Sequence, residues 1–203
     1  MAVVHHTTLT PGKLDLLAVW LPSQPWYVAT GRPPELTRAG GFRLDDPAGE
    51  VGIEFMVVTD QSGEQPASYH VPMTYRAAPL AGAERALIGK AEHGVLGTRW
   101  IYDGAQDPVL TAQLIALLQG TTEAQAQSVT DTPDPSVIRH FTGTDLSPAD
   151  LRIIRQLQPV PQDPRTGPAG SRGYVAGGWQ LPDGIAVRGR LVAVLDQATA
   201  GAE

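Results

Sequence analysis

The stretch His93-Gly-Val-Leu-Gly-Thr-Arg-Trp-Ile-Tyr-Asp-Gly-Ala-Gln-Asp-Pro-Val-Leu110, with the residues up to Gly120, contains the clearest structural signals in the chain. Asp107 can cap the first turn of a helix, and Pro108 suits the first helical position because an N–H there would have no partner. Gly120 is a suitable C-terminal stop. We therefore predict a helix over residues 108–119 that packs on a sheet through one broad apolar face, formed by Val109, Leu110, Leu114, Ile115, Leu117 and Leu118.

A short strand over residues 99–104, ending in a turn, is predicted just before this helix. Arg99, Trp100, Tyr102 and Asp103 could line a pocket at this strand. In the alternative interpretation, the two aromatic side chains pack in the core and at its rim, and Arg99 and Asp103 are surface charges. The alternative is favoured because aromatic residues at strand spacing are usually packing residues.

The composition is that of an ordinary globular protein with one large domain or two small ones. The chain has 203 residues, is 42% hydrophobic and carries a formal net charge of −6. It contains no run of Lys or Arg, so we expect no nucleic-acid partner. Cysteine is absent, which excludes disulfides, thiolate catalysis and Cys-ligated zinc. The sequence shows no signal peptide and no apolar run of about 18 residues, so we expect a cytoplasmic protein without membrane association.

The N-terminal region combines a short predicted helix with an aromatic cluster. Thr10-Pro11 is typical of a helix start, and Pro22 is expected to end that helix. Trp20, Trp26 and Tyr27 lie close together in the sequence, and Arg32 follows them. Such a cluster could be a stacking platform for a sugar, although it more often plugs the end of a small core.

Residues 41–75 have a two-residue period, which is typical of strands. We predict strands at 41–45, 51–58 and 68–75, a hairpin loop at 60–65, and a further strand at 86–90 that leads into the strand of Trp100. The short connections favour an antiparallel meander. Pro72 cannot donate to a ladder, so its strand is expected to lie at an edge or to carry a bulge, and an edge strand would allow homodimers.

The C-terminal part has weaker signals. Residues 121–135 are expected to be a linker or a covering loop, and 136–141 a strand. Ser147 and Asp150 resemble a capping box for a helix over 151–157, with a strand almost equally favoured. Residues 159–173 are predicted to be a loop, and 198–203 to fray. A hairpin over 179–187 turns at Pro182-Asp-Gly184, and residues 190–195 are expected to continue the sheet.

Catalytic and metal-binding motifs are not found. Gly89-Lys90 fails as a phosphate-binding loop because Gly82 is wrongly spaced and Ala91 stands where a Ser or Thr belongs. The histidines are dispersed, and the adjacent pair His5-His6 is expected to be solvated at the terminus. His93, with Glu92 and Asp103, could act as an acid or base, but a hydrogen-bonded loop histidine is more common. We predict no catalytic residue, metal ligand or cofactor.

Three motifs, in family order, resemble the N-terminal cap domain of actinobacterial maltokinases. They are Trp20-Leu-Pro-x-Gln-x-Trp26-Tyr27 with Gly31-Arg32, Tyr69-x-Val-Pro-Met-Thr-Tyr75-Arg76 with Pro79-Leu80, and Arg99-Trp-x-Tyr-Asp-Gly104 with Asp107-Pro-Val109. The resemblance implies an α+β fold, in which a curved antiparallel sheet packs on helices in a cystatin-like outline. The sequence pattern adds a C-terminal β-hairpin region. We therefore predict a cap-like domain at 1–127 and a β-rich extension at 128–203 that packs on or continues the same sheet.

Maltokinases continue from the cap into a kinase-like body that phosphorylates maltose with ATP and magnesium. That chemistry uses a catalytic Asp, a metal-binding Asp and an Asn or its equivalent, whereas this chain has no Asn and no His-x-Asp loop. The resemblance therefore implies a stand-alone, non-catalytic cap homologue. It would be a binding or regulatory protein of maltose, trehalose or glycogen metabolism whose partner is a carbohydrate-active enzyme or a kinase.

Two alternatives remain, a sugar-binding protein and an enzyme that uses His93 or Asp103. The candidate ligand or interface residues are Trp20, Trp26, Tyr27, Arg32, Tyr75, Arg99, Trp100, Tyr102 and Asp103.

Overall fold

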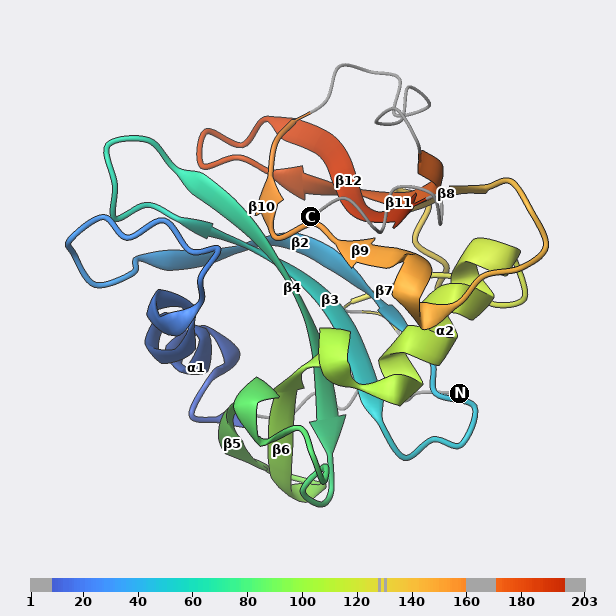
Figure 1. Ribbon diagram of the computed structural model, residues 1–203. Helices are drawn as coiled ribbons and strands as arrows, with labels where there is room; N and C mark the ends of the chain where they lie inside the picture. The colour runs from blue at the N-terminus through green and yellow to red at the C-terminus, as the bar shows by residue number, and fades with distance from the viewer. Residues whose placement is uncertain (1–8, 128, 130, 160–170, 196–203) are drawn as a thin grey trace.

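The computed structural model describes residues 9–127, 129, 131–159 and 171–195. Its described part is mostly antiparallel sheet, with two α-helices, α1 (Lys13–Trp20) and α2 (Pro108–Gln119), packed against it (Figure 1). The predicted antiparallel sheet with helices on it is confirmed.

One sheet contains all twelve described strands. Its main path is β1-β5-β6-β4-β3-β2-β11-β12-β9, while β7 pairs with β2, β8 with β11 and β10 with β4. The strands are β1 (Leu9–Thr10), β2 (Leu36–Leu44), β3 (Gly52–Asp60), β4 (Ala67–Arg76), β5 (Leu87–His93), β6 (Gly97–Asp103), β7 (Gln125–Ala126), β8 (Ile138–Phe141), β9 (Leu151–Ile153), β10 (Gln156–Leu157), β11 (Ser171–Gln180) and β12 (Ala186–Leu195). Four 3₁₀ turns accompany them: η1 (Leu21–Ser23), η2 (Glu84–Ala86), η3 (Gly104–Gln106) and η4 (Pro148–Asp150).

The segment 151–157 joins two distant parts of this sheet. Its first half, β9, pairs with β12, and its second half, β10, pairs with β4. Between them, the N–H of Ile154 donates to the carbonyl of Leu191 at 2.9 Å, and the carbonyl of Arg155 accepts from the N–H of His70 at 2.8 Å. The sheet therefore curves so far that one short segment bridges β12 and β4.

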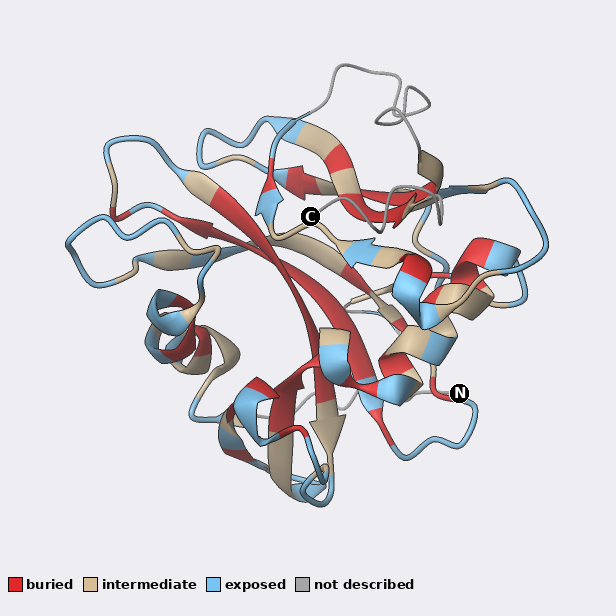
Figure 2. Ribbon diagram, in the orientation of Figure 1, coloured by how far each residue is buried: buried red, intermediate tan, exposed pale blue. Residues whose placement is uncertain are grey.

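The central strands β3 and β4 are buried along most of their length and separate two cores (Figure 2). Side chains alternate between the faces of a strand, so neighbouring residues enter different cores. Phe55 and Val57 belong to the larger core, which α2 covers with Leu110, Leu114, Leu117 and Leu118. Met56 and Val58 belong to the smaller core, which α1 covers with Leu17 and Trp20.

Helix α2 begins and ends as predicted. Asp107 accepts a hydrogen bond from the N–H of Val109 at 2.9 Å, and Gly120 closes the helix with φ +80°. The structure adds a partner that local sequence signals do not indicate. Arg76 of β4 donates to both carboxylate oxygens of Asp107, from Nε and from Nη2, at 2.7 Å each. The start of α2 is thereby tied to the sheet.

Two predictions in the first half of the chain need correction. Helix α1 starts after Gly12, because Thr10 pairs in β1 with Glu92 of β5. Strand β4 is an interior strand that lies between β3 and β6. Pro72 is tolerated there because, on the side away from β3, β10 pairs only with residues 68–69 and β6 only with 73–76. The edge-strand argument for a homodimer at Pro72 is therefore removed.

In the second half, the predicted helix over 151–157 is wrong, and its strand alternative is correct. The capping signal itself is real, since the N–H of Ser147 donates to Asp150 at 2.9 Å, but it serves only the turn η4. Residues 121–135 include β7, which pairs with β2. Strands β11 and β12 pair across the turn at 182–184. Residues 160–170, the C-terminal tail and the His5-His6 pair lie outside the described residues.

Candidate functional site

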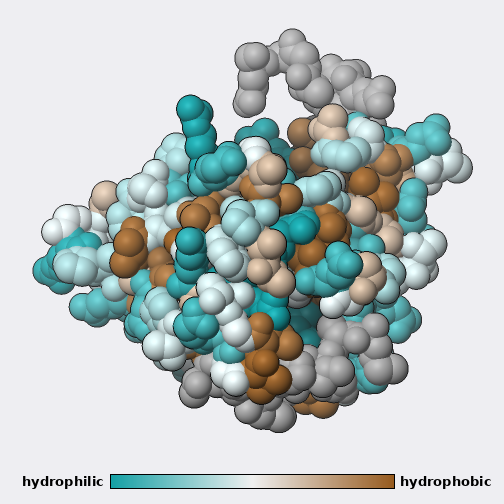
Figure 3. Space-filling view, turned by 90° about the horizontal axis from the view of Figure 1, so that it is seen from below, coloured by the Kyte–Doolittle hydropathy of each residue, from teal (hydrophilic) through white to brown (hydrophobic). Residues whose placement is uncertain are grey.

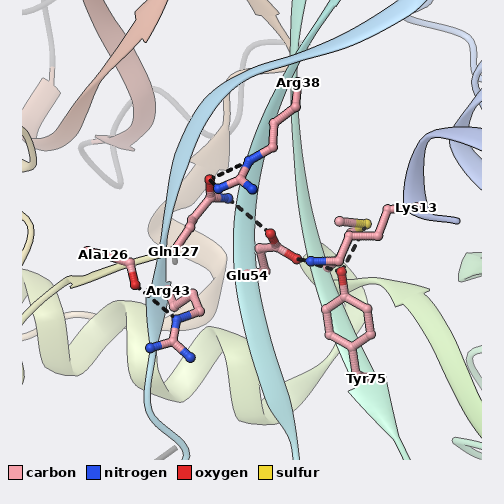
Figure 4. Close-up of polar contacts among 8 residues, drawn as sticks. Lys13, Arg38, Arg43, Glu54, Tyr75, Ala126 and Gln127 are labelled. Carbon is pink, nitrogen blue, oxygen red and sulfur yellow. Dashed lines mark hydrogen bonds and ion pairs between the residues drawn. The ribbon is translucent and has the colours of Figure 1, made fainter. Parts of the chain in front are cut away.

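A buried carboxylate, Glu54 of β3, is the centre of a polar cluster on the α1 side of the sheet (Figure 4). Its Oε2 atom accepts from Lys13 Nζ at 2.6 Å and from the hydroxyl of Tyr75, also at 2.6 Å. Its Oε1 atom accepts from Gln127 Nε2 at 3.0 Å. Arg38 in turn donates to Gln127 Oε1, from Nε at 3.1 Å and from Nη2 at 2.5 Å. Donors from three other segments of the chain thus meet at one carboxylate, which is 4% exposed.

The strand register explains how Tyr75 reaches Glu54. Tyr75 lies opposite Gly52, two residues before Glu54 on β3. A Cβ atom at position 52 would lie 3.3 Å from the Tyr75 side chain, so glycine gives the ring room to lie along the sheet. The ammonium group of Lys13 lies 5.4 Å from the centre of the same ring, within the range of a cation–π contact.

The electrostatics of this cluster favour a structural role. Burial and the neighbouring Glu54 raise the pKa of Tyr75 well above its usual value, so the phenol stays protonated and donates. Both carboxylate oxygens of Glu54 already accept hydrogen bonds from protein donors. A general base needs a lone pair that its substrate can reach, and this carboxylate is 4% exposed and is held by three protein donors. We infer that the cluster fixes α1 and the segment after β7 to the sheet.

The aromatic turn, residues 19–28, forms the second cluster on this side. Trp20 and Trp26 meet edge to face at 5.8 Å, and Tyr27 lies 5.4 Å from Tyr69 of β4. Trp20 is 7% exposed, whereas Trp26 and Tyr27 are half-buried. The cluster thus packs on the smaller core, as the plug interpretation expects, and leaves parts of Trp26 and Tyr27 at the surface.

Tyr27 is anchored through its hydroxyl, which donates to Asp60 at 2.7 Å. Burial and this hydrogen bond raise the pKa of Tyr27 to about 12. Burial opposes ionisation of Asp60, but hydrogen bonds from Tyr27 and from the N–H groups of Ser62 and Glu35 hold its pKa below the usual value. The pair therefore consists of a neutral phenol and an ionised carboxylate, which fixes the end of the aromatic turn.

Arg155, which the sequence did not single out, connects two of the predicted residues. Its Nη2 atom donates to Asp103 at 2.6 Å, and its guanidinium lies 5.0 Å from the centre of the Trp26 ring. The next residue, Gln156, donates to the carbonyl of Trp26 at 2.6 Å. Asp103 is therefore part of a buried ion pair rather than a surface charge. Only the topology, which carries 151–157 to β4, brings these residues together.

The other predicted residues lie apart from these clusters. Tyr102 is buried in a small separate core, where its hydroxyl accepts from the N–H of Leu80 at 2.9 Å. Trp100 lies under the ammonium group of Lys90 at 5.3 Å, Arg99 donates to the carbonyl of Leu96 at 2.8 Å, and Arg32 is exposed in a loop. The residues Arg99, Trp100, Tyr102 and Asp103 thus have separate partners.

His93 is the last residue of β5, and its side chain is hydrogen-bonded to the turn that leads into β6. Its Nδ1 atom accepts from the N–H of Leu96 at 3.1 Å and from that of Val95 at 3.3 Å. His93 pairs with Gly97 at the start of β6, whereas Asp103 ends that strand. The suggested acid–base pair of His93 and Asp103 is therefore not assembled.

The surface around β5 and β6 offers no single dominant apolar area among the described residues. Figure 3 shows several small hydrophobic groups separated by hydrophilic ones. Within the described ranges, no group of three or more His, Asp or Glu side chains is arranged to hold a metal ion. No helix there combines the length and the apolar character needed to cross a membrane.

Comparison with known protein families identifies part of this sequence. Residues 20–107 match the family model of the maltokinase N-terminal cap domain. Residues 20–107 are a maltokinase N-terminal cap-like domain. The matched region, here called the cap domain, begins at Trp20 of the aromatic turn and ends at Asp107, the N-cap of α2. No curated protein matches this sequence.

Two groups of side-chain contacts join the cap domain to residues outside it. Glu54, Tyr75 and Arg38 belong to the cap domain, but Lys13 and Gln127 do not. Likewise, Trp26 and Asp103 belong to it, but their common partner Arg155 does not. The flanking segments are thus integrated with the cap through specific side chains.

Proposed function

We propose that this chain is a non-catalytic cap module, a binding or regulatory protein that associates with a carbohydrate-active enzyme or kinase of maltose, trehalose or glycogen metabolism. The family match over residues 20–107 carries the proposal. The geometry is compatible with it, because the five buried carboxylates of the cap domain all accept hydrogen bonds from protein donors. They are Asp46, Glu54, Asp60, Asp103 and Asp107.

Binding to a purified maltokinase tests this proposal directly. We expect the purified chain to bind the enzyme in isothermal titration calorimetry and to change its rate of maltose phosphorylation. The chain alone is expected to transfer no phosphate from ATP to maltose. An enzyme panel covering maltose, trehalose and glycogen metabolism that shows neither binding nor a change in rate would contradict the partner assignment. Phosphoryl transfer by the chain itself would contradict the non-catalytic assignment.

A sugar ligand on the aromatic turn is the second candidate function. The observation in its favour is the partial exposure of Trp26 and Tyr27. The observation against it is that the Trp26 ring already contacts Arg155, Trp20 and Tyr69. An open aromatic face is what a stacked sugar requires, so we rank this function second.

Thermal unfolding with maltose, trehalose and glucosamine separates the two candidates. If a sugar binds, the wild type at about 100 times the dissociation constant gains roughly 2.7 kcal/mol, and Trp26→Ala gains nothing. If the cap-module proposal is correct, no sugar raises the melting temperature. The exposed Ile185→Ala variant is the matched control, because it lies on the β11–β12 turn, away from the aromatic turn.

A further inference from the structure

A basic region lies on the part of the sheet that follows the cap domain. The strands β8, β9, β11 and β12 contain five arginines, one histidine and no Asp or Glu, although the formal net charge of the chain is −6. These strands lie next to one another in the sheet (Figure 1). The positive charge is thus concentrated in space, although it is dispersed along the sequence.

The strand register places most of these cations on one face. Residues directly opposite each other share a face of a sheet. His140 lies opposite Tyr174, and Arg152 lies opposite Ala193. Arg190 and Arg188 lie opposite Ala176 and Gly178. Val175 and Trp179 alternate with these positions and enter the larger core, so the cations lie on the other side of the sheet. The basic face, as used here, consists of His140, Arg152, Arg188 and Arg190.

The side chains of the basic face are placed to meet a ligand. His140 and Arg152 are exposed, and Arg188 and Arg190 are partly exposed. The residues opposite the last two, Ala176 and Gly178, are small and carry no charge. The Nε atom of Arg188 is buried and has no hydrogen-bond partner within the described part of the chain. A buried donor without a partner is costly, and a bound acceptor would remove that cost.

Nearby carboxylates are already engaged. Asp150, just before β9, accepts from Arg172 at 2.9 Å. Asp183, in the turn between β11 and β12, accepts from the N–H of Ile185 at 3.0 Å. Neither carboxylate accepts from the Nε atom of Arg188.

We propose that the basic face binds a small phosphate monoester. Guanidinium groups bind phosphate through pairs of parallel hydrogen bonds. Arg188 and Arg190 lie about 6.6–6.8 Å apart along their strand and on one face, so the charge of Arg190 acts on a phosphate group that Arg188 binds. This site lies outside the cap domain, and its occupancy does not depend on the proposed partner enzyme.

The observations favour a small ligand over a nucleic acid. Charges interact over about 8 Å at physiological ionic strength, so a small ligand feels mainly the basic face, whereas a long polyanion would also meet the acidic remainder of the chain. In addition, Tyr174 is 3% exposed, because the Arg190 guanidinium and the His140 ring lie 5.3 and 5.6 Å from its ring. It therefore offers no open platform for stacked bases.

Calorimetric titration of the full chain with glucose 1-phosphate, at constant ionic strength, tests the site. We expect saturable binding, with a dissociation constant that Arg188→Gln raises at least tenfold. Arg188→Lys should raise it less, because lysine keeps the charge but cannot donate two parallel hydrogen bonds. Arg85→Gln, an exposed variant on η2 at the other end of the sheet, is expected to bind like the wild type. Unfolding curves of each variant establish that it is folded.

Four results would overturn the proposal. The first is no saturable binding of glucose 1-phosphate by the wild type. The second is equal binding of unphosphorylated glucose. The third is equal weakening of binding by Arg85→Gln and Arg188→Gln. The fourth is tighter binding of a ten-residue oligothymidylate than of glucose 1-phosphate, which would assign the face to nucleic acid instead.

Discussion

Arg76→Ala is expected to lower the free energy of unfolding by about 3–5 kcal/mol, because it leaves a buried carboxylate without its cation. Asp107 is 0% exposed, and both of its oxygens bind the Arg76 guanidinium at 2.7 Å. The same carboxylate caps α2 through the N–H of Val109. Urea unfolding at pH 7, followed by circular dichroism, measures the change.

Two further variants separate the ion pair from the cap. Asp107→Asn keeps a good N-cap side chain but removes the charge, so its loss should come from the unpaired Arg76. Arg76→Lys keeps the charge but loses the pair of parallel hydrogen bonds to Asp107. Its free energy of unfolding should therefore lie between those of the wild type and Arg76→Ala. Arg85→Ala, on an exposed residue, is expected to stay within about 0.5 kcal/mol of the wild type. A loss below about 1 kcal/mol for Arg76→Ala would contradict the argument.

The contribution of this pair should depend on pH in a defined direction. Burial opposes ionisation of Asp107, but the hydrogen bonds from Arg76 and the N–H of Val109 outweigh it and hold its pKa below the usual value. A group whose pKa is lowered by folding stabilises the protein above its unfolded pKa, which is about 3.9 for Asp. That stabilisation is lost as the pH falls through the folded-state value. The difference between the wild type and Arg76→Ala should therefore shrink between pH 5 and pH 2.

The parts of the fold that could be predicted are those with local signals. Asp107, Pro108 and Gly120 define α2 through contacts within a few residues, and the structure keeps them. The helix predicted over residues 151–157 is wrong for the opposite reason. Its capping signal is local and real, but its conformation is decided by ladders to β12 and β4, which lie far away in the sequence.

Pro72 illustrates the limit of a correct rule. A proline does need a position without a ladder partner, but an interior strand can supply one wherever the strands on one side are interrupted. The candidate sites show the same limit. Arg155 meets Trp26 and Asp103 only because of the topology, and the basic face collects arginines from separate strands. A strand-spaced pair such as Arg188-x-Arg190 was the one available sequence signal for that face.

Residues 1–127, the domain predicted from the sequence, are expected not to fold cooperatively when expressed alone. In the full chain, the C-terminal region contributes six of the buried side chains of the larger core, namely Leu157, Val175, Trp179, Leu191, Val192 and Val194. Burial of each such side chain is worth roughly 1.5–3 kcal/mol. Their joint loss is comparable to the whole stability of an ordinary domain, about 5–15 kcal/mol. The fragment would also expose Phe42, Phe55 and Val57 to water.

Proton NMR dispersion and urea unfolding of the fragment decide this question. A dispersed spectrum with one cooperative transition would establish 1–127 as an independent domain and refute the expectation.

A single substitution in the full chain tests the same core. Trp179→Ala should lower the free energy of unfolding by about 3–5 kcal/mol, because Trp179 is buried in it. Its control is Ile185→Ala, because Ile185 is 57% exposed in the adjoining turn and should matter little. If Trp179→Ala changes the free energy of unfolding as little as Ile185→Ala does, the C-terminal strands do not stabilise the cap domain. The stability of the larger core then comes from α2 and the strands of the cap domain alone.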